Sequence, residues 1–231
     1  MLNSLIKEFQ DKASPERARH AQRFFKTGKG QYGEGDVFLG LTMPEQKKII
    51  QKYIGLPLTK VQKLLDSEIH EYRMAAGIIL THKYKKDPEE IFNFYLKNAK
   101  KFNNWDLVDI TCTRVIGQFL FDNPQHKKIL YQLARSKDLW EKRIAIVSTH
   151  AFIKYKEFED TLAISELLLK DTHDLIHKAI GWMLREVGKK DEEVLKNFLK
   201  QHYNQLPRTT LRYAIERFPE QERKKWLTLK K

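Results

Sequence analysis

The chain has 231 residues, of which 41% are hydrophobic and 32% charged, and 43 lysines and arginines against 30 aspartates and glutamates give a net charge of +13. This length is enough for a sizeable buried core, and the composition excludes a disordered chain. A single cysteine, Cys112, excludes a disulfide framework and a cysteine-rich zinc site, and no apolar run approaches the roughly 20 residues that cross a bilayer.

The excess of positive charge, with a pI near 9.6, favours a polyanionic partner, and nucleic acid is the commonest one. A basic surface kept only for solubility is the alternative. The first residues, MLNSLIKEFQDK, lack a basic stretch followed by an apolar one. We therefore expect no secretory signal and a cytoplasmic location.

Proline marks several predicted helix starts. Ser14-Pro15-Glu16 is an N-cap followed by proline at the first helical position, and Asp87-Pro88 and Asn123-Pro124 repeat the pattern. Further caps are expected at Thr42, Thr59 and Ser67. The one long loop is expected at Gly28–Gly40, which holds half of the ten glycines. Apolar residues elsewhere recur at helical spacing without sustained alternation, so the fold is predicted to be all-α.

Four segments recur along the chain at a nearly constant distance. They start at His70, Trp105, Trp140 and His173, which are 35, 35 and 33 residues apart, and each reads as a long helix, a charged turn and a shorter helix. Because an isolated helix pair cannot bury its apolar face, consecutive pairs are expected to stack. We therefore expect a single domain over residues 1–231, a right-handed α-solenoid of HEAT-like repeats that forms a curved superhelix with a basic concave face. A globule of antiparallel helices would give a similar pattern.

The second repeat opens with NWDLVD, residues 104–109. Trp105 and Asp109 are four apart, so both project from one face of the helix. Asp106 lies beside the positive helix end, where a surface carboxylate offsets the helix dipole. Asp109 lies one turn further in, where the other repeats have hydrophobic or basic residues. A buried capping or salt-bridge carboxylate is the alternative to a functional Asp109.

The two later repeats carry an indole next to cations. Trp140 and Arg143 share a helix face, and a stacked pair on the protein surface is the ordinary alternative. In the last repeat Lys178 and Trp182 share a face, with Arg185 just beyond.

Gly181 precedes Trp182 and is unfavourable inside a helix by about 1 kcal/mol. It either admits the close approach of a ligand or relieves packing against the next helix. Cys112 lies among apolar neighbours and is expected to be buried and inert.

In a solenoid, equivalent positions of adjacent repeats line one concave wall. The residues expected to converge there are Trp105, Asp109, Arg143, Lys178 and Trp182. Cations neutralise phosphates and aromatic rings contact sugars or bases, as a nucleic-acid groove requires. A carboxylate repels phosphate, so Asp109 makes sense there if a positive charge develops on the ligand, such as an oxocarbenium ion at a sugar carbon.

The chain resembles the DNA-alkylation-repair glycosylases of the AlkD type, in the superfamily of HEAT-like repeat DNA glycosylases. The matching elements are YGEGDVFLGLTMP at Tyr32–Pro44, WDLVD at Trp105–Asp109, W-x-x-R at Trp140–Arg143 and KAIGWMLRE at Lys178–Glu186. The similarity runs from about Arg19 to about Arg217, and WDLVD and KAIGWMLRE in this order are its most specific parts.

The resemblance implies an enzyme that holds duplex DNA on its concave face and hydrolyses the N-glycosidic bond of cationic N3- or N7-alkylated purines, leaving an abasic site. It implies a monomeric, monofunctional glycosylase of the 3-methyladenine and 7-methylguanine type, without metal or organic cofactor, associated with the nucleoid when bound to DNA. The residues it implies are Asp109 as the catalytic carboxylate, Trp105 and Trp182 against the deoxyribose, and Arg143 at a phosphate, with Lys178 and Arg185 as further DNA-binding residues.

Two departures from the family accompany these matches. An aromatic hydroxyl is expected in the second helix, where this chain has Phe24 and Phe25, and Asn104 occupies a position that can be a second tryptophan. The alternatives to the glycosylase are a non-catalytic HEAT-like module that binds branched or damaged DNA, and a solenoid that binds an acidic protein. Motifs for a phosphate-binding GK[ST] loop, a zinc protease or a serine hydrolase do not occur.

Overall fold

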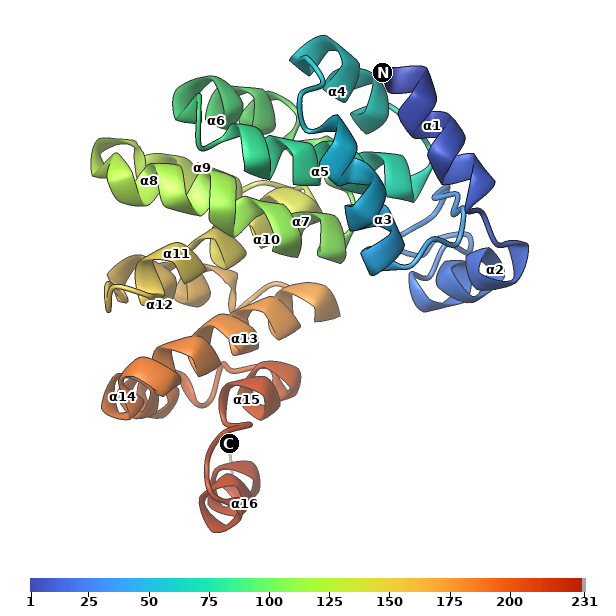
Figure 1. Cartoon of the computed structure of the whole chain (residues 1–231). Coiled ribbons are helices and arrows are strands. Elements are labelled where there is room, and N and C mark those ends of the chain that lie inside the picture. Colours follow the sequence, from blue (N-terminus) through green and yellow to red (C-terminus); the bar gives the residue numbers. More distant parts are fainter. Residues whose placement is uncertain (230–231) are drawn as a thin grey trace. The chain divides into compact units, whose positions relative to one another are not determined.

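The structure, a computed structural model, describes residues 1–229, and it is built from helices (Figure 1). The α-helices are α1 (Leu2–Asp11), α2 (Pro15–Phe24), α3 (Met43–Ile50), α4 (Leu58–Leu65), α5 (His70–Lys83), α6 (Pro88–Lys97), α7 (Trp105–Cys112), α8 (Gln118–Asp122), α9 (Lys128–Ala134), α10 (Leu139–Ser148), α11 (His150–Ile153), α12 (Glu159–Leu168), α13 (Asp174–Lys190), α14 (Glu192–His202), α15 (Arg208–Ala214) and α16 (Glu220–Thr228). Shorter helical turns are η1 (Gln51–Tyr53), η2 (Ala99–Lys101), the π-helical η3 (Thr113–Gly117) and η4 (Pro124–His126). Between residues 1 and 229 no strand forms, and a single parallel bridge joins Val37 to Ile69. The all-α prediction is confirmed.

The helices form two compact units, Met1–Thr111 and Cys112–Lys231. In the first unit α5 is central, with α3, α4 and α6 packed against it and α1 against α3. In the second unit α13 is central, and α10, α12, α14 and α15 pack against it. The single domain over residues 1–231, the handedness and curvature of the superhelix and its basic concave face stay predictions.

The predicted helical repeat is confirmed. The four long segments were expected to start at His70, Trp105, Trp140 and His173, and α5, α7, α10 and α13 begin at these residues or within one position of them. Helices α5, α7 and α13 are each followed by a shorter helix, α6, α9 and α14, whereas α10 is followed by the one-turn α11 and then by α12, which is as long as α10. In the second repeat, α7 continues through the π-helical turn η3 into α8 before that shorter helix begins.

Three of the predicted caps are found. The Ser14 side chain accepts a hydrogen bond from the Arg17 backbone at the start of α2. Thr42 and Glu45 form a capping box at the start of α3. Asp87 is the N-cap residue of α6, with Pro88 at the first helical position.

The other three helix starts differ from the prediction. Thr59 lies inside α4, which begins after Pro57. Ser67 is not the cap of α5, because the bridge to Val37 keeps the chain extended as far as Ile69. Asn123-Pro124 opens only the short turn η4, and α9 begins at Lys128.

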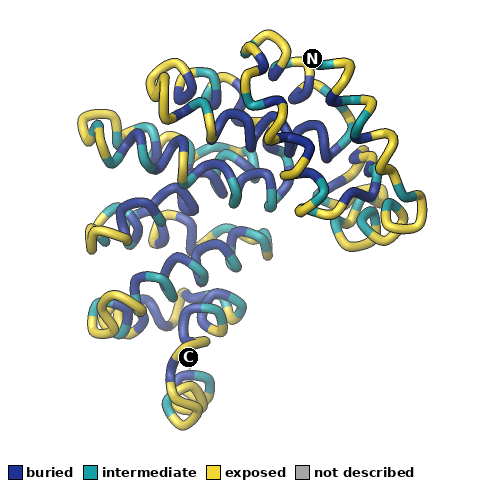
Figure 2. Tube along the Cα trace, viewed as in Figure 1, coloured by how far each residue is buried: buried dark blue, intermediate teal, exposed yellow. Residues whose placement is uncertain are grey.

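Helix α5 is buried along most of its length (Figure 2). Residues 70–81 of this helix are all buried, which is the pattern of a helix enclosed on every side. Three of these buried residues have an acidic or basic side chain, namely His70, Glu71 and Arg73. Burial of such groups is costly unless each finds a partner, so their contacts determine what can pack against α5.

The predicted loop is confirmed between α2 and α3, and Glu71 holds its end in place. The Glu71 carboxylate accepts hydrogen bonds from the backbone N–H groups of Leu39, Gly40 and Leu41 at 2.8–3.3 Å. Gly40 has φ +84°, and a Cβ there would lie 2.4 Å from the Ser14 carbonyl oxygen. Only glycine lets the loop approach the start of α2 so closely.

Replacement of Gly40 by alanine is expected to lower the free energy of unfolding by about 3 kcal/mol or more, because positive φ and a backbone clash both oppose the new methyl group. Gly30→Ala is the matched control: Gly30 has φ +76° but nothing within 4 Å of its Cβ position, so about 1–2 kcal/mol is expected. Urea denaturation measures both. Equal losses would contradict the close approach at Gly40.

Candidate functional site

Asn104 sets the start of α7, the helix that carries Trp105 and Asp109. Its side-chain oxygen accepts a hydrogen bond from the Trp105 N–H at 2.8 Å, and its carbonyl accepts from Val108 at 3.1 Å. Asn104 is fully buried, and its amide donates to Asp36 at 3.2 Å. Asn104 therefore serves as a polar anchor for the helix.

The first turn of α7 is tied to α5 by a histidine between two carboxylates. His70 Nε2 lies 2.9 Å from Asp106 Oδ2, and His70 Nδ1 lies 3.3 Å from Asp36 Oδ2. The expectation that Asp106 is a surface residue is wrong, because its side chain is only 13% exposed and contacts His70. Asp106 still serves its own helix, accepting a hydrogen bond from the Leu107 N–H.

Arg73 completes this buried group of charges. Its guanidinium donates to Asp36 at 2.6 Å and to the Ser67 carbonyl at 2.7 Å. His70, Arg73 and Asp36 are each nearly fully buried. With His70 protonated, the positive charges of His70 and Arg73 balance the negative charges of Asp36 and Asp106. Each buried charge then has a partner of opposite sign, as burial requires.

The pKa values agree with that charge state. Burial would lower the pKa of His70, but the charge of Asp106 and hydrogen bonds to both carboxylates raise it to about 9. Burial would raise the pKa of Asp36, yet hydrogen bonds from His70 and Asn104 and the charge of Arg73 lower it. At neutral pH His70 is an imidazolium that donates from both ring nitrogens.

Aromatic rings from α2 and the loop pack on Trp105. The Phe25 ring is stacked on the Trp105 indole, with centroids 5.5 Å apart, and on Phe38, with centroids 5.1 Å apart. Phe38 in turn stacks on His70 at 4.6 Å, and Phe24 meets the indole edge-on at 6.0 Å. Phe24 is 57% exposed and Trp105 is half-buried. The two phenylalanines that depart from the family therefore hold the indole by packing.

A cavity of about 700 Å³ lies beside these rings within the first unit. It is lined by residues of α2, the loop end and α3, together with Phe25, Phe38, Glu71 and Asp106. Two of its carboxylates are already engaged, Glu71 by loop N–H groups and Asp106 by His70, whereas the third, Glu16, is exposed. The cavity thus borders the anchored start of α7.

Asp109 lies one turn into α7, on the face that carries Trp105, and is half-buried. Its neighbours Leu107 and Val108 are fully buried. The anchoring contacts of Asn104 and Asp106 lie in the turn that precedes it, so the network that fixes the start of α7 also positions the helix backbone at Asp109.

In the second unit, Arg143 connects α10 to the start of α13. Its Nη1 donates to the Leu175 carbonyl oxygen at 2.6 Å. Trp140 and Arg143 are only 6% and 5% exposed. The interpretation as a stacked pair on the surface is therefore wrong, and the guanidinium has a structural contact within this unit.

Helix α13 presents the remaining predicted residues. Trp182 is half-buried, with its ring 6.1 Å from that of His150. Lys178 pairs with Asp174 at 2.7 Å, and Arg185 pairs with Glu216 of the turn after α15. All three residues are partly exposed.

Gly181 has a packing role. A Cβ at Gly181 would lie 2.5 Å from the Tyr213 Cβ and 2.7 Å from the Thr210 carbonyl oxygen. The glycine thus lets α15 approach α13 closely, as the packing alternative predicted. Cys112 is buried, as expected.

The predicted residues thus fall into two groups, Trp105 and Asp109 on α7 and Arg143, Lys178, Trp182 and Arg185 in the second unit. Their convergence on one wall stays a prediction. Sequence reasoning missed Asp36, His70 and Arg73. The only signal was that His70 opens a repeat at the position where the next repeat has Trp105.

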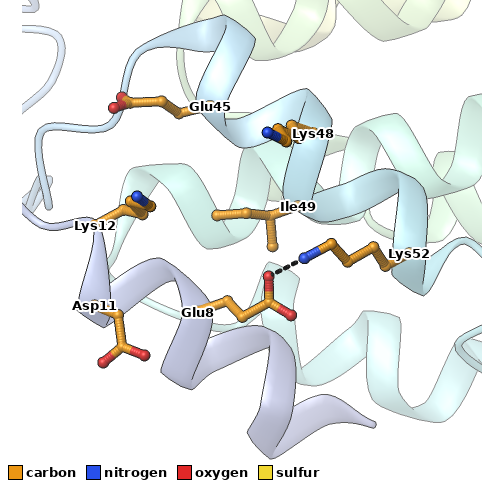
Figure 3. Close-up of a pocket in the computed structure, with 7 residues that line it drawn as sticks. All are labelled: Glu8, Asp11, Lys12, Glu45, Lys48, Ile49 and Lys52. Atoms are coloured by element: carbon orange, nitrogen blue, oxygen red, sulfur yellow. Dashed lines mark hydrogen bonds and ion pairs between the residues drawn. The ribbon is translucent and has the colours of Figure 1, made fainter.

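A second cleft, of about 390 Å³, lies between α1 and α3 (Figure 3). It is lined by Glu8, Asp11, Lys12, Glu45, Lys48, Ile49 and Lys52. Lys52 pairs with Glu8 at 2.6 Å. Because its carboxylates and ammonium groups are equal in number, the cleft favours neither anions nor cations. We interpret it as part of the packing interface between two helices.

Residues 1–229 contain neither a metal-binding cluster nor a membrane-spanning helix. No group of three or more His, Cys, Asp or Glu side chains there is arranged to hold a metal ion. Within the same stretch, each helix is too short or too polar to cross a bilayer.

The fold and the anchored Trp-Asp helix define a helical-repeat protein. A family model described as DNA alkylation repair enzyme matches residues 5–218. The chain therefore belongs to the DNA alkylation repair enzyme family, whose substrate is DNA.

The fold is shared with a solved structure. A protein from Enterococcus faecalis, described as a predicted DNA alkylation repair enzyme, superposes with a TM-score of 0.73 at 18% identity, covering 90% of this chain and 97% of that one. At this identity the likeness shows the fold alone. Among curated proteins no match to the chain is found.

His70→Asn is expected to lower the free energy of unfolding by about 3–5 kcal/mol, because it leaves Asp36 and Asp106 buried without their shared cation. His82→Asn is the control, since His82 is exposed near the end of the same helix and a change within about 0.5 kcal/mol is expected. Urea denaturation followed by circular dichroism measures both. A His70 variant as stable as the His82 variant would contradict the buried ion network.

The pH dependence of stability provides a separate test. Because the folded pKa of His70 is raised to about 9, its contribution is complete below the unfolded value near 6.5 and is lost as pH rises through about 9. The difference in unfolding free energy between wild type and His70→Asn should therefore shrink by on the order of 3 kcal/mol between pH 6 and pH 10. A difference that stays constant over this range would contradict the raised pKa of His70.

Proposed function

We propose that the protein is a DNA glycosylase that hydrolyses the N-glycosidic bond of cationic N3- or N7-alkylated purines in duplex DNA, leaving an abasic site. The main support is the first part of α7, where Trp105 and Asp109 share a face of a helix held by buried hydrogen bonds from Asn104 and His70. Membership of the DNA alkylation repair enzyme family agrees with this activity.

Asp109 is the catalytic carboxylate in this proposal. As the bond between C1′ and the base nitrogen breaks, its electron pair goes to the base and positive charge develops on the sugar. A carboxylate whose position is fixed beforehand stabilises that charge without reorganising during the reaction. The same carboxylate positions the water that adds to C1′, and the water proton is released as the abasic sugar forms.

The leaving group explains why one carboxylate suffices. Alkylation at N3 or N7 places a formal positive charge on the base, so the base departs as a neutral molecule and needs no general acid. The barrier then lies mainly in the charge on the sugar, which is the charge that Asp109 opposes.

The other predicted residues hold the DNA. Trp105 and Trp182 pack against the deoxyribose, since an indole offers a flat apolar surface next to a charged backbone. Arg143 contacts a phosphate beside the lesion, and Lys178 and Arg185 bind the backbone further along. A monomer suffices, because one chain carries all of these residues.

Asp109→Asn is expected to reduce the release of 7-methylguanine from methylated duplex DNA by a factor of about 100 or more while leaving DNA binding within about twofold, because the amide keeps the shape and loses the charge. Asp11→Asn, at an exposed position on α1, is the control and should excise at the wild-type rate. Chromatography of free bases measures release, and fluorescence anisotropy measures binding.

Two results would contradict the proposal. Unchanged excision by the Asp109 variant would remove that carboxylate from the reaction. Wild-type protein that binds duplex DNA but releases no base would favour the non-catalytic DNA-binding module.

A further inference from the structure

The end of the chain forms a cavity rich in arginine, outside the residues assigned to the reaction. It has a volume of about 380 Å³ and lies among α15, the turn that follows it and α16. Its lining residues are Arg208, Arg212, Tyr213, Ile215, Glu216, Arg223 and Leu227. Arg208 Nη2 donates to the Leu227 carbonyl oxygen at 2.6 Å and so joins the start of α15 to the end of α16.

The acidic groups around this cavity are already paired. Glu216, the one carboxylate in the lining, pairs with Arg185 from α13. Glu222 pairs with Lys196 and Glu220 with Lys224.

Two of the lining arginines have no carboxylate as an ion-pair partner among the described residues. Within residues 1–229, no carboxylate forms an ion pair with Arg212 or Arg223. The cavity therefore keeps an excess of positive charge that the protein itself does not neutralise.

Guanidinium groups gathered around one cavity repel each other and attract an anion. Their planar forks match the oxygens of a phosphate, to which they donate two hydrogen bonds at once. Tyr213 lines the same space, and the phenolic hydroxyl of tyrosine can also donate to an anionic oxygen. The chemistry of the lining thus fits a phosphate group.

The position of the cavity relates it to the DNA-binding residues of the second unit. Helix α15 is pressed against α13 at Gly181, immediately before Trp182, and Tyr213 is one of the residues at that contact. Arg185 reaches the cavity through its ion pair with Glu216. A nucleic acid strand that contacts Trp182 and Arg185 would therefore have its backbone close to Arg212.

We propose that this cavity binds a backbone phosphate of the DNA, at a second point of contact beyond the strand that meets Trp182. This inference rests on the proposed function for its ligand, since it adds a phosphate site to the same protein–DNA complex. It concerns binding and assigns no part in the bond cleavage to Arg212 or Arg223.

The test uses the full chain and an unmodified duplex labelled with fluorescein, so that no base is excised. Arg212→Gln and Arg223→Gln are each expected to weaken binding about five- to tenfold at low salt. Each should also reduce the slope of log K against log salt concentration by about 1, as expected for the loss of one phosphate contact. Arg217→Gln is the matched control, because Arg217 is exposed in the turn between α15 and α16 and does not line the cavity.

The outcomes separate the possible ligands. Slopes for Arg212→Gln and Arg223→Gln that equal the slope for Arg217→Gln would overturn the proposal. Calorimetry with inorganic phosphate forms the second arm: phosphate binding that depends on Arg212, together with an unchanged DNA slope, would assign the cavity to free phosphate and also overturn it. Thermal melting of each variant checks that the fold is intact.

Failure of the proposed function is distinguishable from failure of this inference. If the wild-type protein releases no alkylated base, but the arginine variants show the smaller salt slope, the phosphate site stands and the proposed glycosylase activity is contradicted. If the wild-type protein releases alkylated bases, but the arginine variants keep the wild-type salt slope, the glycosylase activity stands and the phosphate site is contradicted.

Discussion

The cost of burying charge organises the first unit of this protein. His70 lies in the core of α5 with a carboxylate on each ring nitrogen, one from the loop and one from the first turn of α7. Burial of the Asp36 carboxylate is costly without the His70 cation and Arg73, and the side chains of His70, Asp36 and Arg73 are almost completely shielded from bulk water. Loop, α5 and α7 are therefore positioned by one requirement, that the buried charges match. The same requirement therefore determines the position of the helix face that carries Trp105 and Asp109.

The departures from the family have a physical explanation in this arrangement. Phe25 lies between Phe38 and the Trp105 indole in a continuous stack that ends on the His70 ring. Where a tyrosine hydroxyl would add a polar contact, this chain relies on ring packing and on the attraction between a protonated imidazole and an aromatic face. Asn104, in place of an indole, joins the buried hydrogen bonds and starts the helix. Phe25 and Asn104 thus both stabilise the start of α7, one by ring packing and the other by hydrogen bonds.

The second unit is arranged by close packing around α13 rather than by buried charge. Gly181 brings α15 within contact distance of α13, so that Thr210 and Tyr213 lie against Gly181, and Glu216 of the turn after α15 pairs with Arg185. A side chain at Gly181 would force the two helices apart and separate these groups. The glycine that the sequence left between two interpretations therefore acts through packing, and any effect on nucleic acid binding follows from where it places α15.

Local patterns in the sequence were sufficient for the helices, the repeat spacing, the long loop and the pairing of Trp105 with Asp109 on one face, because helical periodicity and proline or capping signals act over a few residues. They could not reveal the ion network, since Asp36, His70 and Asp106 are each more than thirty residues from the next and carry no shared motif. The same limit applied to the surface role expected for Asp106 and to the alternative interpretation of Trp140 and Arg143 as a surface pair. Burial is a property of the packed molecule: whether a charged side chain meets water or a partner depends on which distant elements cover it, and only the tertiary structure decided that.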